Sequence, residues 1–426
     1  MKVRIQPGKL KGGLAVPASK SEAHRAAIFT ALSLYDEWEK GVATAEKTEA
    51  LFRERMNEIA EKSLFSQDVL ATVDCLTKLL FTDSGVYDCR ESGSTLRFLL
   101  PVVLALKGEG EFRGSPKLME RGVSVYEEVL KPLGVTFEKT ENALIVKGKL
   151  PVGTYEIPGN ISSQYISGFL MAFPLLSGER TLIVREPVES VDYMQMTLEI
   201  AARFGVDLRA IRRPGEGVIF DISGPKPYKN TSYSLDGDRS LFANFRAFIE
   251  TGSSLEFTGL LEESLQGDAA STVFFKTIRE AENPEIHLEN NPDLGPVLFA
   301  FSAALGKDVV FTGIRRLRYK ESDRVAAMCE ELRKFGISTE IRYGESEKTS
   351  KIQGEKEYQN LRILPGTLKK PAVPLNGHHD HRIVMALSFL LSLTGGEIEG
   401  AEAVEKSAPR WFETLKRLGL AVEIYE

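Results

Sequence analysis

One pattern of polar and apolar positions recurs about every 72 residues along the chain. Each copy begins with a short polar opening, which is followed directly by an apolar run long enough for a helix. Because the run is apolar on nearly all sides, it predicts a buried helix whose polar first turn faces a cleft. The six copies begin at Ser19–Phe29, Ser92–Leu100, Ser162–Leu170, Asp238–Phe245, Pro292–Ala300 and His379–Leu387.

A second, amphipathic helix is predicted in each copy. Four of these helices end in an apolar-Gly-apolar step, at Gly134, Gly205, Gly336 and Gly419. A glycine suits the left-handed residue just past a helix, and strand-like segments such as Ala143–Lys147 follow. Each unit therefore predicts two helices and several short strands, and six such units make a mixed α/β chain.

The polar openings have two interpretations. Ser and Asp are the usual N-cap residues of helices, which would explain them without any ligand. Alternatively, the free N–H groups and the dipole of each buried helix attract an anion. Arg or Lys in most of the openings favours the second interpretation.

Two charged stretches interrupt the repeat. Residues 36–65 have a helical composition, and residues 341–360 have the pattern of a polar hairpin. We expect both to be solvated surface.

Length and composition narrow the class of protein. A chain of 426 residues predicts two or three domains, and 42% hydrophobic with 27% charged residues is typical of a globular protein. The net charge of −6 argues against nucleic acid and anionic membranes as partners, so a bound anion must meet a local cationic pocket.

Three features of the sequence concern the compartment. The three widely spaced cysteines predict reduced thiols rather than disulfides or a CxxC metal site. Residues 1–9 lack the apolar stretch of a secretory signal, and the longest apolar run is too short to span a bilayer. We therefore expect a cytoplasmic protein.

The segment from Arg318 to Arg324 is the most specific cluster of charged residues. If it were helical, Lys320, Glu321 and Arg324 would share one face. Such a face is either an exposed, ion-paired helix start or an anion receptor with a built-in acid or base. Ser21 and Arg25 repeat the four-residue spacing, with Lys20 at the mouth of their helix.

The histidines of His378–Arg382 raise the question of a metal site. The chain has no HExxH spacing and only two other histidines, so a zinc site is the weaker interpretation. A cap at Asp380 with Arg382 directed at a carboxylate or phosphate suits the segment better. The GxxxxGK[ST] and GxGxxG patterns are absent, so ATP and NAD are unsupported.

Seven segments occur in one order along the chain: Val16–Arg25, Arg90–Arg97, Gly159–Tyr165, Asn291–Asp293, Leu317–Arg324, Asp380–Ala386 and Glu405–Pro409. Together they resemble the EPSP synthase group of the enolpyruvyl transferase family. The resemblance implies a two-domain inside-out α/β barrel built from six βαβαββ-type repeats, three per domain. The N-terminal domain would be residues 18–233, and the C-terminal domain residues 1–17 with 234–426, with the active site in the cleft between them.

The resemblance also implies a reaction. The enolpyruvyl group of phosphoenolpyruvate would be transferred to the 5-hydroxyl of shikimate 3-phosphate, by addition to a tetrahedral intermediate and elimination of phosphate. This step serves chorismate and aromatic amino acid biosynthesis. No metal or organic cofactor is implied, and we expect a monomer whose partners are these two small molecules.

The matching motifs assign residues to roles. Three residues would be catalytic: Asp293 would accept the proton of the 5-hydroxyl, Glu321 would protonate the methylene carbon, and Lys20 would be the third. The expected phosphoenolpyruvate-binding residues are Lys20, Gly93, Arg97, Arg121, Gln164, Arg324, Arg382 and Lys406. The expected shikimate 3-phosphate-binding residues are Lys20, Ser21, Arg25, Ser162, Ser163, Gln164, Ser190, Tyr193, Asp293 and Lys320.

Two other functions are alternatives to this one. The sibling enzyme that acts on UDP-N-acetylglucosamine has Lys-Asn where this chain has Lys20 and Ser21, and it usually has a loop cysteine near residues 112–121, where none occurs here. An inactive homologue that serves as a binding module would be expected to lose its charged site residues first. Here they are present together.

Overall fold

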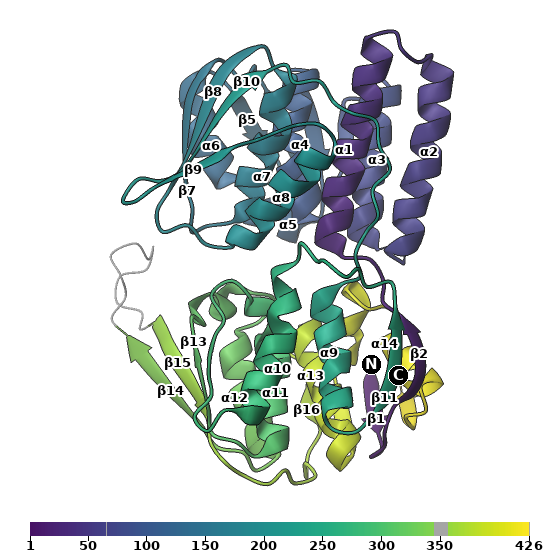
Figure 1. The fold of residues 1–426 in the computed structure, drawn as a ribbon, viewed down its shortest axis with the longest axis vertical. Coiled ribbons are helices and arrows are strands. Elements are labelled where there is room, and N and C mark those ends of the chain that lie inside the picture. Colours follow the sequence, from purple (N-terminus) through teal and green to yellow (C-terminus); the bar gives the residue numbers. More distant parts are fainter. Residues whose placement is uncertain (65, 345–356, 426) are drawn as a thin grey trace. The chain divides into compact units, whose positions relative to one another are not determined.

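The computed structural model describes residues 1–64, 66–344 and 357–425 (Figure 1). The chain divides into two compact units. The N-terminal unit is residues 17–236, and the C-terminal unit is residues 1–16 with 237–426.

The N-terminal unit begins with a segment that is entirely helical between residues 20 and 81, apart from its turns. Helices α1 (Lys20–Glu39), α2 (Ala45–Lys62) and α3 (Gln67–Phe81) follow one another. The strands expected in the first unit were therefore wrong for these described residues. The cause is the composition of α2, which is rich in Ala, Glu, Lys and Arg and so favours a helix over a strand.

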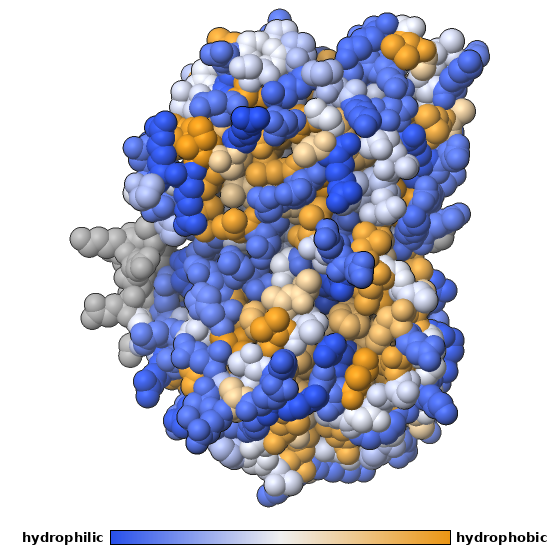
Figure 2. Space-filling model, viewed as in Figure 1, coloured by the Kyte–Doolittle hydropathy of each residue, from blue (hydrophilic) through white to orange (hydrophobic). Residues whose placement is uncertain are grey.

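Helix α2 also corrects the expectation that residues 36–65 are simply solvated. Phe52 and Met56 on one face are fully buried, and Phe52 contacts the ring of Phe81 on α3. The outer side of α2 is mostly hydrophilic in Figure 2. The helix is amphipathic, and five of its eighteen residues are buried.

The rest of the N-terminal unit contains two copies of a βαβαββ arrangement. In the first, the sheet order is β3-β4-β6-β5, and in the second it is β7-β8-β10-β9. In both, the first two strands are parallel and the last two pairings are antiparallel. The first copy comprises β3 (Val86–Asp88), α4 (Gly93–Leu106), β4 (Glu109–Arg113), α5 (Pro116–Arg121), α6 (Ser124–Leu130), β5 (Thr136–Lys139) and β6 (Ala143–Lys147). The second comprises β7 (Gly153–Pro158), α7 (Ser163–Ala172), β8 (Gly178–Arg185), α8 (Val191–Arg203), β9 (Ala210–Arg213) and β10 (Gly217–Gly224).

The C-terminal unit contains the same arrangement twice more. The sheet orders are β12-β13-β15-β14 and β16-β17-β1-β18, so strand β1 (Lys2–Ile5) completes a sheet from the other end of the chain. The first copy comprises β12 (Glu285–His287), η4 (Pro292–Leu294), α11 (Gly295–Leu305), β13 (Val309–Thr312), η5 (Arg315–Tyr319), α12 (Arg324–Lys334), β14 (Thr339–Gly344) and β15 (Glu357–Ile363). The second comprises β16 (Leu375–Asn376), α13 (His381–Thr394), β17 (Gly396–Glu399), η6 (Ala401–Lys406), α14 (Trp411–Arg417) and β18 (Val422–Tyr425).

One segment of the C-terminal unit has a smaller sheet. Strand β2 (Lys11–Ala15) pairs in parallel with β11 (Ser254–Thr258), and the two form a two-stranded sheet. Helices α9 (Arg239–Glu250) and α10 (Ser271–Glu280) and the short helix η3 (Gly267–Ala270) complete this segment.

The burial of the first helices agrees with their apolar sequences. Every residue of α11 from Gly295 to Ala303 is buried, and α13 is buried from His381 to Ser392. The four predicted helix-ending glycines, Gly134, Gly205, Gly336 and Gly419, all have φ between 80° and 101°, the left-handed conformation expected of them. Because these helices are packed in the core, the position of each polar first turn is determined by that packing.

Strands β14 and β15 pair antiparallel at the two ends of the predicted hairpin 341–360, whose residues 345–356 lie outside the described residues. Across the described part of the chain, no helix has the length and apolar character needed to cross a membrane. The described fold is thus a mixed α/β fold with fourteen α-helices and several mixed sheets.

Candidate active site

In the N-terminal unit, two arginines flank the backbone of Gly93 at the opening of α4. A Cβ atom built on Gly93 would lie 3.4 Å from Nη1 of Arg97 and 3.5 Å from Nη2 of Arg121. Arg97 also donates to Oε1 of Gln164 at 2.7 Å, and Gln164 donates to Ser94 Oγ at 2.9 Å. Four residues assigned to phosphoenolpyruvate are therefore brought together here.

Lys20, in the first turn of α1, lies beside the first turn of α3. Its Nζ is 2.9 Å from Oδ2 of Asp68. The backbone carbonyl of Asp68 accepts a hydrogen bond from Thr95 Oγ1 at 3.3 Å, and Thr95 belongs to α4. Asp68 thus connects the predicted Lys20 to the helix that carries Gly93 and Arg97.

Arg25 is held within the protein more completely than the sequence suggests. It is 2% exposed, and four of its N–H donors bond to Thr197 Oγ1 (2.7 Å), Ser21 O (2.8 Å), Ser167 Oγ (3.1 Å) and Tyr193 O (3.1 Å). All four acceptors are neutral. Burial lowers the pKa of Arg25 to about 10, so it remains a cation at neutral pH.

The serines predicted to bind phosphate lie at the openings of α7 and α8. Ser162 caps α7, because its Oγ accepts from the N–H of Gln164 at 3.3 Å, and Ser163 is the first residue of that helix. Ser190 directly precedes α8 and has φ 57°, a conformation that is unfavourable for a non-glycine residue. Tyr193 lies in the first turn of α8.

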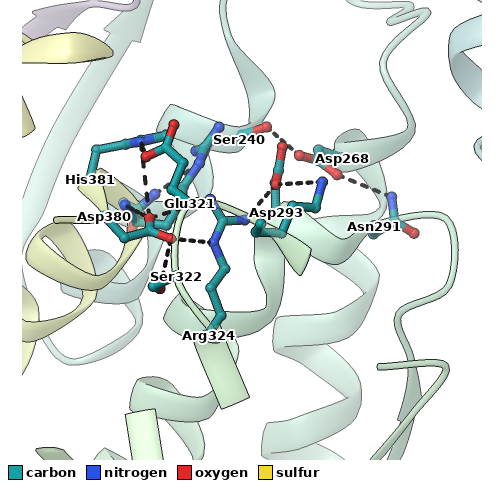
Figure 3. A network of polar contacts seen from close by, with 12 residues as sticks. Ser240, Asp268, Asn291, Asp293, Glu321, Ser322, Arg324, Asp380 and His381 are labelled. Carbon is teal, nitrogen blue, oxygen red and sulfur yellow. Dashed lines mark hydrogen bonds and ion pairs between the residues drawn. The ribbon is translucent and has the colours of Figure 1, made fainter. Parts of the chain in front are cut away.

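The C-terminal unit centres on Asp293, which lies in η4 just before α11 (Figure 3). Its Oδ1 accepts from Nη1 of Arg324 at 2.6 Å and lies 3.4 Å from Nζ of Lys320. Burial alone would raise the pKa of Asp293, but Lys320, Arg324 and Arg382 outweigh it and hold that pKa well below the usual value. Asp293 is therefore an ionised carboxylate among three cations.

Arg324 is also paired with Asp380, the residue before α13. Its Nε is 2.8 Å from Oδ2 of Asp380, and its Nη2 is 3.3 Å from Oδ1. Asp380 accepts further hydrogen bonds from Ser322 Oγ and from the N–H of Arg382, so it caps α13 as predicted. Although burial opposes ionisation, Arg324 lowers the pKa of Asp380, and the two carboxylates raise the pKa of Arg324 against its own burial.

The chain from Lys320 to Asp323 is not helical, because α12 begins at Arg324 with Asp323 as its cap. The helical face proposed for this segment was therefore wrong. Lys320 and Arg324 meet instead at Asp293, and Glu321 pairs with His381, whose Nδ1 is 2.8 Å from Glu321 Oε2. Burial lowers the pKa of His381, which favours the neutral imidazole.

Two sets of side chains in the described residues have the spacing of a metal site: Glu321, Asp380 and His381, and Glu330, Glu331 and His378. Asp380 already binds Arg324 with both oxygens, and His381 binds Glu321. Glu331 accepts from Lys334 and the Asn376 N–H and pairs with His378. Hydrogen bonds and ion pairs within the protein thus account for both groups.

Among the predicted site residues, Arg97 in the N-terminal unit and Arg382 in the C-terminal unit each leave a buried Nε without a partner in the described part of the chain. Arg180, which is not a predicted site residue, leaves a third such Nε. A buried unpaired donor is costly, so the Nε atoms of Arg97 and Arg382 are suited to an anionic ligand. The predicted Lys406 has a side chain that lies outside the described part of the chain.

Several residues of these clusters were not expected from the sequence. They are Asp68, Asp268, Asp380 as the partner of Arg324, and His381 as the partner of Glu321. Asp68 and Asp268 are each the second residue of a helix, α3 and η3, so both lie at a helix opening as the residues of the repeated pattern do. That position could have drawn attention to them, although it does not reveal their partners.

The comparisons with known proteins cover the whole chain. The family profile described as EPSP synthase (3-phosphoshikimate 1-carboxyvinyltransferase) matches residues 5–415. A 3-phosphoshikimate 1-carboxyvinyltransferase of Clostridium kluyveri is 32% identical over 98% of this chain and 97% of its own length. One of Brachyspira hyodysenteriae is 27% identical over 99% of this chain and 100% of its own length.

A solved structure of EPSP synthase from Acinetobacter baumannii has the same fold. Its TM-score is 0.74 at 20% sequence identity, and the match covers 100% of both chains. The enolpyruvyl transferase NikO from Streptomyces tendae matches less well, with a TM-score of 0.61 at 13% identity over 99% of this chain and 98% of its own. From the profile, the curated relatives and the fold together, we conclude that this chain belongs to the EPSP synthase family.

Proposed function

We propose that the two clusters described above perform the reaction of the EPSP synthase family. In that reaction the enolpyruvyl group of phosphoenolpyruvate is transferred to the 5-hydroxyl of shikimate 3-phosphate, and phosphate is released. Both substrates are polyanions, and both clusters are rich in cations within a chain of net charge −6. The N-terminal cluster binds phosphate groups, and the C-terminal cluster supplies the acid and the base.

The observation that carries this assignment is the state of Asp293. A general base must be ionised and must reach the proton that it removes. Asp293 is kept ionised by Lys320 and Arg324, yet its side chain remains 24% exposed. It is thus available to take the proton of the 5-hydroxyl as the oxygen adds to C2 of phosphoenolpyruvate.

Glu321 is the proposed acid. As the oxygen adds to C2, the methylene carbon C3 gains a proton from Glu321 and becomes a methyl group. In the second step this methyl group loses a proton as phosphate leaves, which restores the double bond. The neutral imidazole favoured at His381 supports the acid role, because its N–H or its lone pair can accommodate either protonation state of Glu321.

The remaining residues bind the substrates. In the N-terminal unit, Lys20, Gly93, Arg97, Arg121 and Gln164 take the phosphate of phosphoenolpyruvate. In the C-terminal unit, Arg324 and Arg382 take its carboxylate, with Lys406 as a further phosphate ligand. Within the described residues, the Nε of Arg382 has no partner, and the three hydrogen bonds of Arg324 use three of its five N–H donors. Both observations support this role.

Shikimate 3-phosphate is bound mainly by the N-terminal unit. Ser21 and Arg25 hold its carboxylate, Ser162, Ser163 and Ser190 hold its phosphate, and Tyr193 and Lys320 contact other parts of it. The hydroxyls at the openings of α7 and α8 support the phosphate role, because helix N-termini favour anions.

We also propose that the chain is a variant of the six-repeat inside-out barrel. Four segments have the full βαβαββ order, which supports it. In this proposal the first repeat has exchanged its sheet for α2, and the fourth keeps only β2 and β11.

Phosphate release tests the proposed function. With phosphoenolpyruvate and shikimate 3-phosphate the purified chain should release phosphate continuously, and with UDP-N-acetylglucosamine in place of shikimate 3-phosphate it should release none. Lys20→Met should abolish the activity, whereas Lys47→Met, at an exposed lysine on α2 of the same unit, should retain it. Failure of the parent chain with shikimate 3-phosphate would overturn the proposal.

A further inference from the structure

Another buried carboxylate, Asp268, lies beside Asp293 in the C-terminal unit (Figure 3). Asp268 belongs to η3 and is 7% exposed, whereas the side chain of Asp293 is 24% exposed. Asp268 is therefore less accessible to a substrate than Asp293. None of the segments that resemble the family includes it. Its place in the site therefore needs an explanation of its own.

Asp268 connects two of the polar openings in this unit. One carboxylate oxygen accepts a hydrogen bond from Ser240 Oγ, in the first turn of α9. The other accepts from Nδ2 of Asn291 at 3.2 Å, two residues before Asp293. Asn291 is itself buried, and its carbonyl accepts from the N–H of Leu294, which closes the turn that carries Asp293. The carboxylate of Asp268 thus holds this turn in place.

Asp268 also acts on Asp293 through its charge. Burial and the charge of Asp293 raise the pKa of Asp268 to about 6, against the opposing effects of Ser240, Arg382 and Asn291. Above that pH the ionised Asp268 repels the charge on Asp293 and offsets the cations Lys320, Arg324 and Arg382 that surround it. Of the charged groups in the described residues, these three cations have the largest effects on Asp293.

We propose that Asp268 is a positioning residue for Asp293, which holds the Asn291–Asp293 turn and supplies the negative charge that keeps Asp293 an effective base. This inference rests on the proposed function, since it assumes that Asp293 removes the proton. A carboxylate stabilised too strongly by cations is a weak base, because its affinity for the proton is low. A second carboxylate restores part of that affinity without contacting the substrate.

The test compares Asp268→Asn with the parent at several pH values. At pH 8 the variant should lose about 10-fold in kcat with a smaller change in KM, since the lost charge weakens the base rather than substrate binding. Near pH 5 the parent's Asp268 is protonated as well, so the ratio of the two turnover rates should approach 1. Titration of the substrates' phosphates affects both proteins equally and cancels in this ratio.

Ser240→Ala gives an independent measurement in case Asp268→Asn does not fold, and thermal unfolding of both variants shows whether they do. Removing a donor that favours the ionised carboxylate raises the pKa of Asp268. The fall in kcat on acidification should therefore begin about one pH unit higher than in the parent.

The outcomes of these two measurements are distinct. A ratio of parent kcat to Asp268→Asn kcat that decreases on acidification, or an upward shift with Ser240→Ala, supports the proposal. A ratio that is the same at pH 8 and pH 5, together with an unmoved profile for Ser240→Ala, would overturn it, since that is the behaviour of a purely structural residue. Inactivity of the parent would instead contradict the proposed function.

Discussion

Two pairs of buried ionisable groups, one pair in each unit, respond to burial in opposite ways. In the N-terminal unit, burial lowers the pKa of His24 to about 3 and raises that of Glu22 to about 7, so both tend toward their neutral forms. In the C-terminal unit, Asp293 and Asp380 are also buried in part or fully, yet both have pKa values below their usual range. The difference is the guanidinium of Arg324, which contacts both carboxylates.

Burial by itself favours the neutral form of an ionisable group. A cation paired with a buried carboxylate favours the ionised form instead. Among the described residues, His24 has a hydrogen bond only with the hydroxyl of Thr72, and Arg25 donates only to neutral acceptors.

In the N-terminal cluster, Arg97 donates to the neutral amide of Gln164, although Lys20 pairs with Asp68. In the C-terminal cluster, Arg324 pairs with both Asp293 and Asp380 and keeps them ionised. We therefore expect changes in the N-terminal cluster to affect mainly substrate binding, and changes at Asp293 and Glu321 to affect mainly turnover.

The largest expected effect is on turnover, from a change in the C-terminal cluster. Glu321→Gln should lower kcat by roughly 10²–10⁴, the usual contribution of general acid catalysis. The KM values should stay near those of the parent, because glutamine keeps the shape of the side chain. Steady-state phosphate release with both substrates varied measures this split. Near-normal turnover would exclude Glu321 as the acid.

The next effect concerns the stability of the N-terminal unit. Glu22 is 1% exposed and accepts from Tyr233 Oη at 2.6 Å and from the Asp236 N–H at 3.4 Å, with Arg203 also acting on it. Because burial raises its folded pKa, folded Glu22 binds more protons than the unfolded chain between about pH 4.5 and 7. Its contribution to stability is thus present at low pH and lost as pH rises through about 7, by about 2.5 kcal/mol between pH 5 and 8.

Urea unfolding at pH 5 and pH 8 measures this contribution. The chain has two tryptophans, so a Trp411→Phe background leaves Trp38 as the reporter of the N-terminal unit. Glu22→Gln should reduce the loss of stability between the two pH values relative to the parent. His24 has the opposite pH dependence but is present in both proteins, so it cancels. An unchanged difference between the pH values would show that Glu22 is ionised in the folded protein.

A smaller loss of stability is expected from Arg25→Lys, without any ligand. Lysine cannot reproduce the fork of donors that reaches Thr197, Ser167 and Tyr193, so buried acceptors lose their partners. The free energy of unfolding should fall by about 2 kcal/mol. If the stability of the ligand-free variant is unchanged and only shikimate 3-phosphate binding weakens, Arg25 binds the ligand but does not stabilise the core.

The smallest effect is expected from Gly93→Ala. The new methyl group would enter the space between Arg97 and Arg121 while touching them at ordinary contact distances, so the fold should be retained. The KM for phosphoenolpyruvate should rise about 10-fold, which corresponds to about 1.4 kcal/mol, with a smaller change in kcat.

Gly13→Ala provides the matched control, since no atom lies within 4 Å of the added Cβ there. Equal KM values for the two alanine variants would argue against phosphate binding beside Gly93. If Gly93→Ala changed kcat and left the KM unchanged, the N-terminal cluster would affect turnover rather than binding.

Local sequence patterns determined much of this protein. The recurrence of polar openings and apolar runs predicted the buried helices, and four glycines with positive φ confirmed where the second helices end. Ser92, Ser162, Asp238 and Asp380 all cap their helices through their side chains. These features depend on residues a few positions apart, so a single stretch of sequence is enough to specify them.

The tertiary structure alone decided which charges meet. Arg324 and Asp380 are 56 positions apart, Lys20 and Asp68 are 48 apart, and no spacing rule connects either pair. Strand β1 completes a sheet with β17 and β18 from the opposite end of the chain. Such pairings arise only when packed helices and sheets bring distant segments together, and they determine which buried groups keep their charge.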